Sequence, residues 1–435
     1  MSVRSRRALL LCLAAALVVL SPRAPAGAAP DAKTAAEERK TAERVAKLWT
    51  DAATALKDKG RKAEAQKALA AAKAADPKAA GLDALSLGVE ALPDAAGEDA
   101  DAKKRLDAAG AEAAKAWERL ASLPHDGKDD ARFAQYLVRA VEAEPTKARL
   151  GKAAGTARQM SGNAANALAV GLLLSRLRDL DPDPAGAARY DAIEAEAAQS
   201  DVALVKSKDH PMVAWLSLPK GFTKRGETPV LVAVDGAGAN FLGAARGFAS
   251  SRGSRKYMVL APCSLSNTNE LKAETYPFYS AATLQEWGSR RIEFDLPGLE
   301  AILKALQARY GAAKKVAITG FSGGGNLCYS LTMQRPALVW ASVPACANFQ
   351  PGLASGAEPP ADGGPPVWIL TGEKDEHRDN VFGAKPGIEG QADWAEESFK
   401  TLKFTHVKRT MLPGVGHSSC GDKVWSFLDE VSAGK

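Results

Sequence analysis

The amino-acid sequence predicts an α/β fold, with a mostly parallel sheet covered by helices on both faces and preceded by an all-helical domain. The first half is rich in strong helix formers, with apolar residues at helical spacing. The second half alternates apolar runs with helix-like stretches, which is typical of a parallel sheet buried on both faces. The chain has 435 residues, 46% of them hydrophobic and 25% charged, which suits two globular units.

The amino terminus has the three-part pattern of a secretory signal peptide. Arg4, Arg6 and Arg7 precede an apolar run over 8–20, and small residues follow at 26–28. This run is too short to span a bilayer, so we predict a signal peptide over 1–28 and an exported protein, periplasmic or extracellular. A short membrane anchor is the alternative, and the export route, twin-arginine or general, stays open.

Removal of the signal peptide changes the charge of the chain. Residues 1–28 hold four arginines and no acidic residue, so the net charge falls from +6 to +2. A charge this small gives no reason to expect a nucleic-acid partner. No later apolar run is long enough for a transmembrane helix, so no integral membrane span is expected in the mature chain.

Residues 30–200 are predicted to form an Ala-rich helical domain. Apolar residues recur at helical spacing between Val45 and Leu56, and acid-proline pairs end helices at Pro77 and Pro145. These prolines are 68 residues apart, twice the period of tetratricopeptide repeats. A degenerate tetratricopeptide array and a plain helical domain both fit, and a protein partner for this half stays open.

Residues 205–435 are predicted to form the second domain, with the sheet. Apolar, β-branched runs indicate strands at 212–218, 229–234, 257–261, 316–319, 367–370 and 407–412. In such sheets the chemistry lies at the carboxyl ends of the strands. Catalytic residues are therefore expected in the segments that follow these runs.

Ser322 is the candidate nucleophile. Gly320-Phe321-Ser322-Gly323-Gly324 fits G-x-S-x-G, in which glycines permit a tight turn from strand to helix. An apolar strand leads directly into the motif and a helix can follow it. A nucleophilic serine at a strand-to-helix turn requires both elements. The alternative is a glycine-rich turn with an incidental serine.

A serine hydroxyl needs a base that is held by an acid, and in this arrangement the acid and then the histidine follow the serine in the chain. Asp375 follows the predicted strand 367–370 and is the candidate acid. Glu376 and Asp379 share its loop and are the alternatives.

His417 is the candidate base. It follows the last predicted strand and precedes a helix predicted over 421–431. His377 is the rival among the five histidines, but it precedes the last strand. A loop histidine without a catalytic role is the remaining alternative.

The oxyanion hole is expected from backbone N–H groups after an early strand. The small residues between Asp235 and Asn240 supply one donor, Ala237 or Gly238, and Gly323 supplies the other. A glycine-rich turn without a ligand role is the alternative.

Four cysteines lie outside the predicted signal peptide, and they allow three fully paired connectivities. They are Cys263, Cys328, Cys346 and Cys420. A bridge at Cys420 would pin the His417 loop, whereas buried free thiols are the alternative. No cluster has metal-ligand spacing, so neither a metal nor another cofactor is predicted.

An aromatic group lies between the predicted strand 257–261 and the helix after Asp295. These side chains are expected either in the core or capping the site, and they are Tyr276, Phe278, Tyr279 and Trp287.

From about residue 209 onward the chain resembles the α/β-hydrolase family, close in layout to secreted polyhydroxybutyrate depolymerases, feruloyl esterases and dienelactone hydrolases. The resemblance rests on the ordered Ser322, Asp375 and His417 segments, and it departs at Asp235-Gly236, where that group usually has His-Gly. It implies hydrolysis of a small or polymeric ester through an acyl-enzyme on Ser322. A prolyl-oligopeptidase-type serine peptidase is one alternative, and a non-catalytic binding protein built on this fold is the other.

Overall fold

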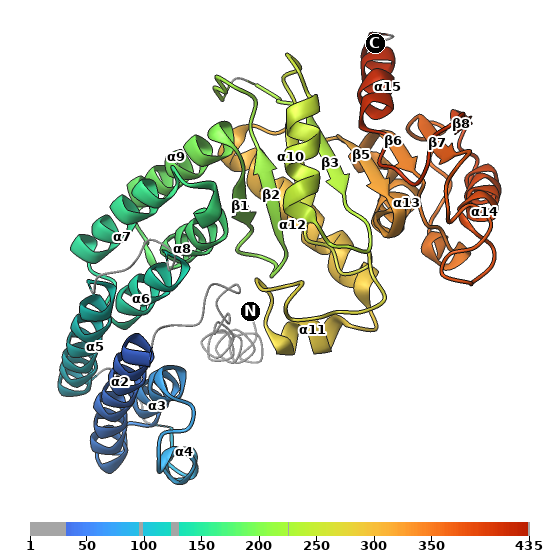
Figure 1. Ribbon diagram of the computed structural model, residues 1–435. Helices are drawn as coiled ribbons and strands as arrows, with labels where there is room; N and C mark the ends of the chain where they lie inside the picture. Colours follow the sequence, from blue (N-terminus) through green and yellow to red (C-terminus); the bar gives the residue numbers. More distant parts are fainter. Residues whose placement is uncertain (1–31, 95–98, 123–129, 225, 434–435) are drawn as a thin grey trace. The chain divides into compact units, whose positions relative to one another are not determined.

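The computed structural model describes residues 32–94, 99–122, 130–224 and 226–433 (Figure 1). The predicted signal peptide, 1–28, lies outside them. The chain forms two compact units that divide between Tyr190 and Asp191. This boundary lies inside the helix that ends at Ser200, just before the first strand begins at Ala203. The second half of that helix therefore belongs to the second unit.

The first unit is helical. Its elements are α2 (Ala32–Asp58), α3 (Lys62–Ala75), α4 (Leu82–Glu90), α5 (Ala100–Ala121), α6 (Asp130–Ala143), α7 (Lys147–Met160), the short turn η1 (Ala164–Asn166), α8 (Ala167–Leu180) and the start of α9 (Pro184–Ser200). Pro77 and Pro145 both fall between helices, as their breaking effect predicts. Alanines and a few large side chains, Trp49 and Trp117 among them, form the core.

The second unit is built on one sheet, in which the described residues contribute eight strands. The strands are β1 (Ala203–Lys206), β2 (Val213–Ser217), β3 (Val230–Val234), β4 (Met258–Pro262), β5 (Val316–Phe321), β6 (Val339–Ala345), β7 (Val367–Gly372) and β8 (Val407–Leu412). Their order is β1-β2-β4-β3-β5-β6-β7-β8, and only β2 runs against the others. The central strands are buried along their whole length, as continuous apolar runs predict.

Helices cover both faces of this sheet (Figure 1). On one face lie α10 (Phe241–Ser251) and α15 (Gly421–Ala433), which share an apolar cluster with Phe248 and Trp425. On the other lie α12 (Arg291–Tyr310), α13 (Gly325–Gln334) and α14 (Ile388–Thr401), where Tyr329 packs with Phe399. The predicted architecture, a mostly parallel sheet with helices on both faces after an all-helical region of the chain, is confirmed.

Short elements complete the second unit. They are α11 (Ala281–Trp287) and the turns η2 (Ser322–Gly324), η3 (Pro336–Leu338) and η4 (Pro351–Ala354). The aromatic side chains Tyr276, Phe278 and Tyr279 are buried and contact one another, so they belong to the core.

The second half of α9 is tied to the sheet unit through Glu194. This carboxylate is fully buried and accepts hydrogen bonds from Arg309 Nη1 and Tyr310 Oη, both at 2.6 Å. Arg309 and Tyr310 lie at the end of α12. None of the helices in the described ranges combines the length and the hydrophobicity that a transmembrane span requires.

Candidate active site

Ser322 lies at the sharp turn between β5 and α13. Its φ is 50°, in the left-handed region that side chains other than glycine rarely adopt. A β-carbon on Gly320 would lie 2.5 Å from the Gly324 carbonyl oxygen, and one on Gly324 would lie 2.5 Å from the Val234 carbonyl oxygen. The turn therefore needs glycine on both sides of Ser322, because its backbone folds closely on itself and on β3.

The end of β6 holds the Ser322 turn in place. The Ser322 N–H donates to the Cys346 carbonyl oxygen at 3.1 Å, and the Asn348 N–H donates to the Ser322 carbonyl oxygen at 2.8 Å. The Ser322 backbone is thus bonded in both directions to the segment that follows β6.

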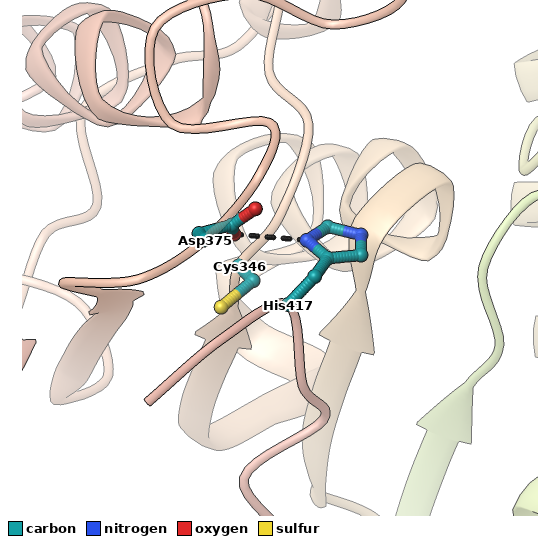
Figure 2. Close-up of side chains that lie close together, drawn as sticks. All are labelled: Cys346, Asp375 and His417. Carbon is teal, nitrogen blue, oxygen red and sulfur yellow. Dashed lines mark hydrogen bonds and ion pairs between the residues drawn. The ribbon is translucent and has the colours of Figure 1, made fainter. Parts of the chain in front are cut away.

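Asp375 and His417 come together at the carboxyl ends of β7 and β8 (Figure 2). Asp375 is only 6% exposed, and its Oδ2 lies 2.8 Å from His417 Nδ1. Its Oδ1 accepts the backbone N–H of His377 at 2.8 Å. The two alternative acids, Glu376 and Asp379, are exposed. Asp375 is therefore the carboxylate of this loop that contacts His417.

His417 is half-buried, and its ring lies 4.7 Å from that of Phe321, the residue before Ser322. Burial lowers the pKa of His417. The hydrogen bonds with Cys346 and Asp375, together with the negative charge of Asp375, raise it by more, so the pKa lies above its ordinary value. The rival, His377, stands with its ring edge-on, 4.9 Å from the His417 ring.

The two segments predicted to supply the oxyanion donors lie beside each other and beside Ser322. A β-carbon on Gly236 would lie 3.1 Å from Ser322 Cβ, and one on Gly323 would lie 3.3 Å from the Ala237 nitrogen. Both distances are shorter than most contacts that real β-carbons make. This close approach puts the backbone of Ala237 and that of Gly323 in one small region next to the serine.

Asp235, where the chain departs from the His-Gly pattern, holds the turn after β3. Its Oδ2 accepts the Asn240 N–H at 2.5 Å. Burial raises the pKa of Asp235, and the backbone hydrogen bonds from Asn240 and Gly236 only partly oppose this. The carboxylate thus takes a structural hydrogen bond inside the turn.

A polar network that the sequence does not indicate supports this turn. Asn267 Nδ2 donates to the Gly236 carbonyl oxygen at 2.7 Å, and Tyr276 Oη donates to Asn267 Oδ1 at 2.9 Å. Asp295, fully buried, accepts the N–H groups of the two residues before Asn267 at 2.8 and 2.9 Å. No local signal marks these side chains, because they meet only when β4, α12 and the β3 turn are assembled.

Cys346 also belongs to the site. Its Sγ, an Asp375 oxygen and a His417 ring nitrogen lie within 4.8 Å of one another, the one such group of potential metal-binding atoms in the described part of the chain (Figure 2). The 2.8 Å contact between Asp375 and His417 already engages two of these side chains as a hydrogen-bonded pair.

Neither protein-family models nor curated protein sequences match this chain. Solved structures do resemble it. A poly(3-hydroxybutyrate) depolymerase from Bordetella parapertussis is 18% identical, with a TM-score of 0.40, over 56% of this chain and 98% of its own. A thermostable esterase is 18% identical, with a TM-score of 0.37, over 54% of this chain and 62% of its own, so less than two thirds of that esterase is spanned. Dipeptidyl peptidase 4 of Porphyromonas gingivalis is 13% identical, with a TM-score of 0.36, over 54% of this chain and 35% of its own.

Proposed function

We propose that this protein is a serine hydrolase that cleaves carboxylic esters through an acyl-enzyme on Ser322. The observation that most supports this is the 2.8 Å contact between Asp375 and His417, at strand ends beside the strained Ser322 turn. An acid that holds a histidine next to a serine on a tight strand-to-helix turn is the arrangement that activates a hydroxyl for attack on a carbonyl.

In this mechanism Ser322 Oγ attacks the ester carbonyl carbon while His417 Nε2 takes the hydroxyl proton. Asp375 accepts the hydrogen bond of Nδ1–H and stabilises the imidazolium that forms. The oxyanion accepts hydrogen bonds from the N–H groups of Gly323 and Ala237, or Gly238. The alcohol leaves with the proton from His417, and a water molecule, deprotonated by the same nitrogen, then releases the acid and regenerates Ser322.

A fluorophosphonate probe tests the proposal directly, because it reacts with an activated serine. We expect wild-type protein to be labelled, the label to map to Ser322, and Ser322→Ala to remain unlabelled. Ser355→Ala removes an exposed serine and is the matched control, which should label normally. Unlabelled wild type, beside a known serine esterase that labels in the same conditions, would favour the non-catalytic alternative.

A panel of acyl nitrophenyl esters and aminoacyl-proline anilides separates the two hydrolase classes. We expect turnover of the esters. Turnover of the anilides alone would instead support the peptidase alternative.

We also propose that the chain is exported, on the strength of the charged and apolar pattern at its amino terminus. Amino-terminal sequencing of protein from the native host, fractionated into cytosol, periplasm and medium, tests this. We expect the exported fractions to hold a form that begins near residue 29. A protein found only in the cytosol, with its amino terminus intact, would contradict the proposal.

A further inference from the structure

Two thiols lie against the loop that carries His417. Cys346 directly follows β6 and is fully buried, and its Sγ lies 3.8 Å from the Gly416 carbonyl oxygen. Cys420 directly precedes α15 and is half-buried, and its Sγ lies 3.4 Å from the Ser418 carbonyl oxygen. One sulfur therefore contacts the backbone just before His417 and the other contacts it just after. Both thiols are free in the structure.

The two thiols also contact each other. A hydrogen bond between them lowers the pKa of Cys420 and raises the pKa of Cys346. Cys420 packs against the same apolar cluster as Ala345, the residue before Cys346. The side chains thus meet in one place although they are far apart in the sequence.

The two thiols differ in a way that suits sequential oxidation. Cys420 is partly exposed and has the more acidic thiol, which are the properties of a cysteine that attacks an oxidant. Cys346 is buried beside the His417 ring, which can accept its proton. Cys420 would therefore react first, and Cys346 would resolve the product.

We propose that Cys346 and Cys420 form a reversible disulfide that ties the His417 loop to the end of β6. With a small-molecule disulfide such as oxidised glutathione as oxidant, the Cys420 thiolate attacks one sulfur and expels one glutathione thiolate. Cys346 passes its proton to His417, and its thiolate attacks the Cys420 sulfur of the mixed disulfide and expels the second glutathione thiolate. Two protein thiols are oxidised and one glutathione disulfide is reduced to two thiols.

The bridge would stabilise the second unit, because it closes a long loop and so restricts the unfolded chain. Because Ser322 is bonded to the Cys346 backbone, the same link would couple the His417 loop to the Ser322 turn. Dithiothreitol should reverse the reaction and return both cysteines to free thiols.

The test uses the full chain, first reduced and then incubated with oxidised glutathione. We expect a peptide that links Cys346 to Cys420 in a non-reducing digest, the loss of both thiols to alkylation after denaturation, and an unfolding midpoint roughly 5 °C or more above that of the reduced protein. None of these measurements needs hydrolase activity, so they test the disulfide independently of the proposed function.

Cys420→Ser is the main test variant, because the side chain is only half-buried and the change is small. It should give the same unfolding midpoint in oxidant and in reductant. Cys328→Ser is the matched control, since Cys328 is buried with its Sγ 3.6 Å from Ser342 Oγ, and it should keep the wild-type difference between the two conditions. A stable glutathione adduct on Cys420 with no linked peptide would overturn the proposal, as would two thiols that remain fully alkylatable.

Discussion

The backbone N–H of Ser322 donates to the carbonyl oxygen of Cys346 at 3.1 Å, and both residues have positive φ, 50° and 43°. The candidate nucleophile is thus hydrogen-bonded to a second residue with left-handed backbone, which directly follows the neighbouring strand β6. Left-handed backbone at residues other than glycine costs about 1–2 kcal/mol each and persists only where the surrounding structure holds it.

The strain at Ser322 can be measured with two inactive variants. Ser322→Gly removes the side chain that disfavours φ of 50°, whereas Ser322→Ala keeps the β-carbon. We expect the glycine variant to exceed the alanine variant in free energy of unfolding by about 0.5–1 kcal/mol, after the greater unfolded-state entropy of glycine is included. Urea denaturation of both variants checks this, and equal or reversed stabilities would show that the turn stores no such strain.

The contact between Asp375 and His417 predicts how activity depends on pH. A general base must be neutral, and the pKa of His417 is raised, so activity should fall as the pH drops through a pKa above the ordinary value for histidine. Asp375→Asn removes a hydrogen bond and a charge that raise this pKa, so the acid limb should move to lower pH. The same change should lower kcat by about three to four orders of magnitude.

Initial rates across pH for wild type and Asp375→Asn supply the measurement. Asp379→Asn neutralises an exposed acid of the same loop and is the matched control, with an unchanged profile expected. An acid limb that stays in place in Asp375→Asn would exclude His417 as the titrating group.

The two neighbouring histidines should respond differently to removal. His417→Ala loses the ring that contacts Asp375, so we expect kcat/KM to fall by about three orders of magnitude or more. His377→Ala keeps the backbone N–H that Asp375 accepts, so its loss should stay within about tenfold. Steady-state kinetics on one nitrophenyl ester decides between them, and the reverse pattern would make His377 the base.

Two glycines of the predicted oxyanion region should also differ. A β-carbon on Gly323 would lie 1.9 Å from the Asn267 carbonyl oxygen, so Gly323→Ala must displace that backbone. We expect a loss of about 100- to 1,000-fold in kcat, as when one oxyanion donor is removed. At Gly238 a β-carbon meets no atom within 4 Å, so Gly238→Ala should be nearly neutral and serves as the control. Similar losses in both variants would contradict this arrangement.

Much of the fold could be predicted because its signals are local. The strand before Ser322, the helix after it and the final helix each follow from apolar spacing and glycine placement within a short stretch. The sequence does not predict β6, because its strand pattern is weak. Ala341 and Ser342 have small side chains, and proline, which stands at position 344, is rare inside a central strand. α12 begins earlier than its sequence suggests, with Pro297 inside it.

Some residues of the candidate site can be predicted from local sequence, and others cannot. Ser322, Asp375 and His417 could be proposed from chain order, because each follows a recognisable strand. Cys346 could not be placed near them without β6, and Asn267 contacts Gly236 only across the assembled sheet. Contacts of this kind depend on tertiary structure, so the spacing of residues along the chain does not predict them.

Glu194 has a consequence for how the two halves of this protein can be separated. Its carboxylate belongs to α9, yet its partners, Arg309 and Tyr310, end a helix of the sheet unit. A fragment that starts at residue 200 would leave the Arg309 guanidinium, 11% exposed, without that carboxylate, at a cost of about 3–5 kcal/mol. A gene fusion or protease cut that leaves the sheet unit stable therefore has to fall before Asp191, so that the second half of α9 stays with that unit.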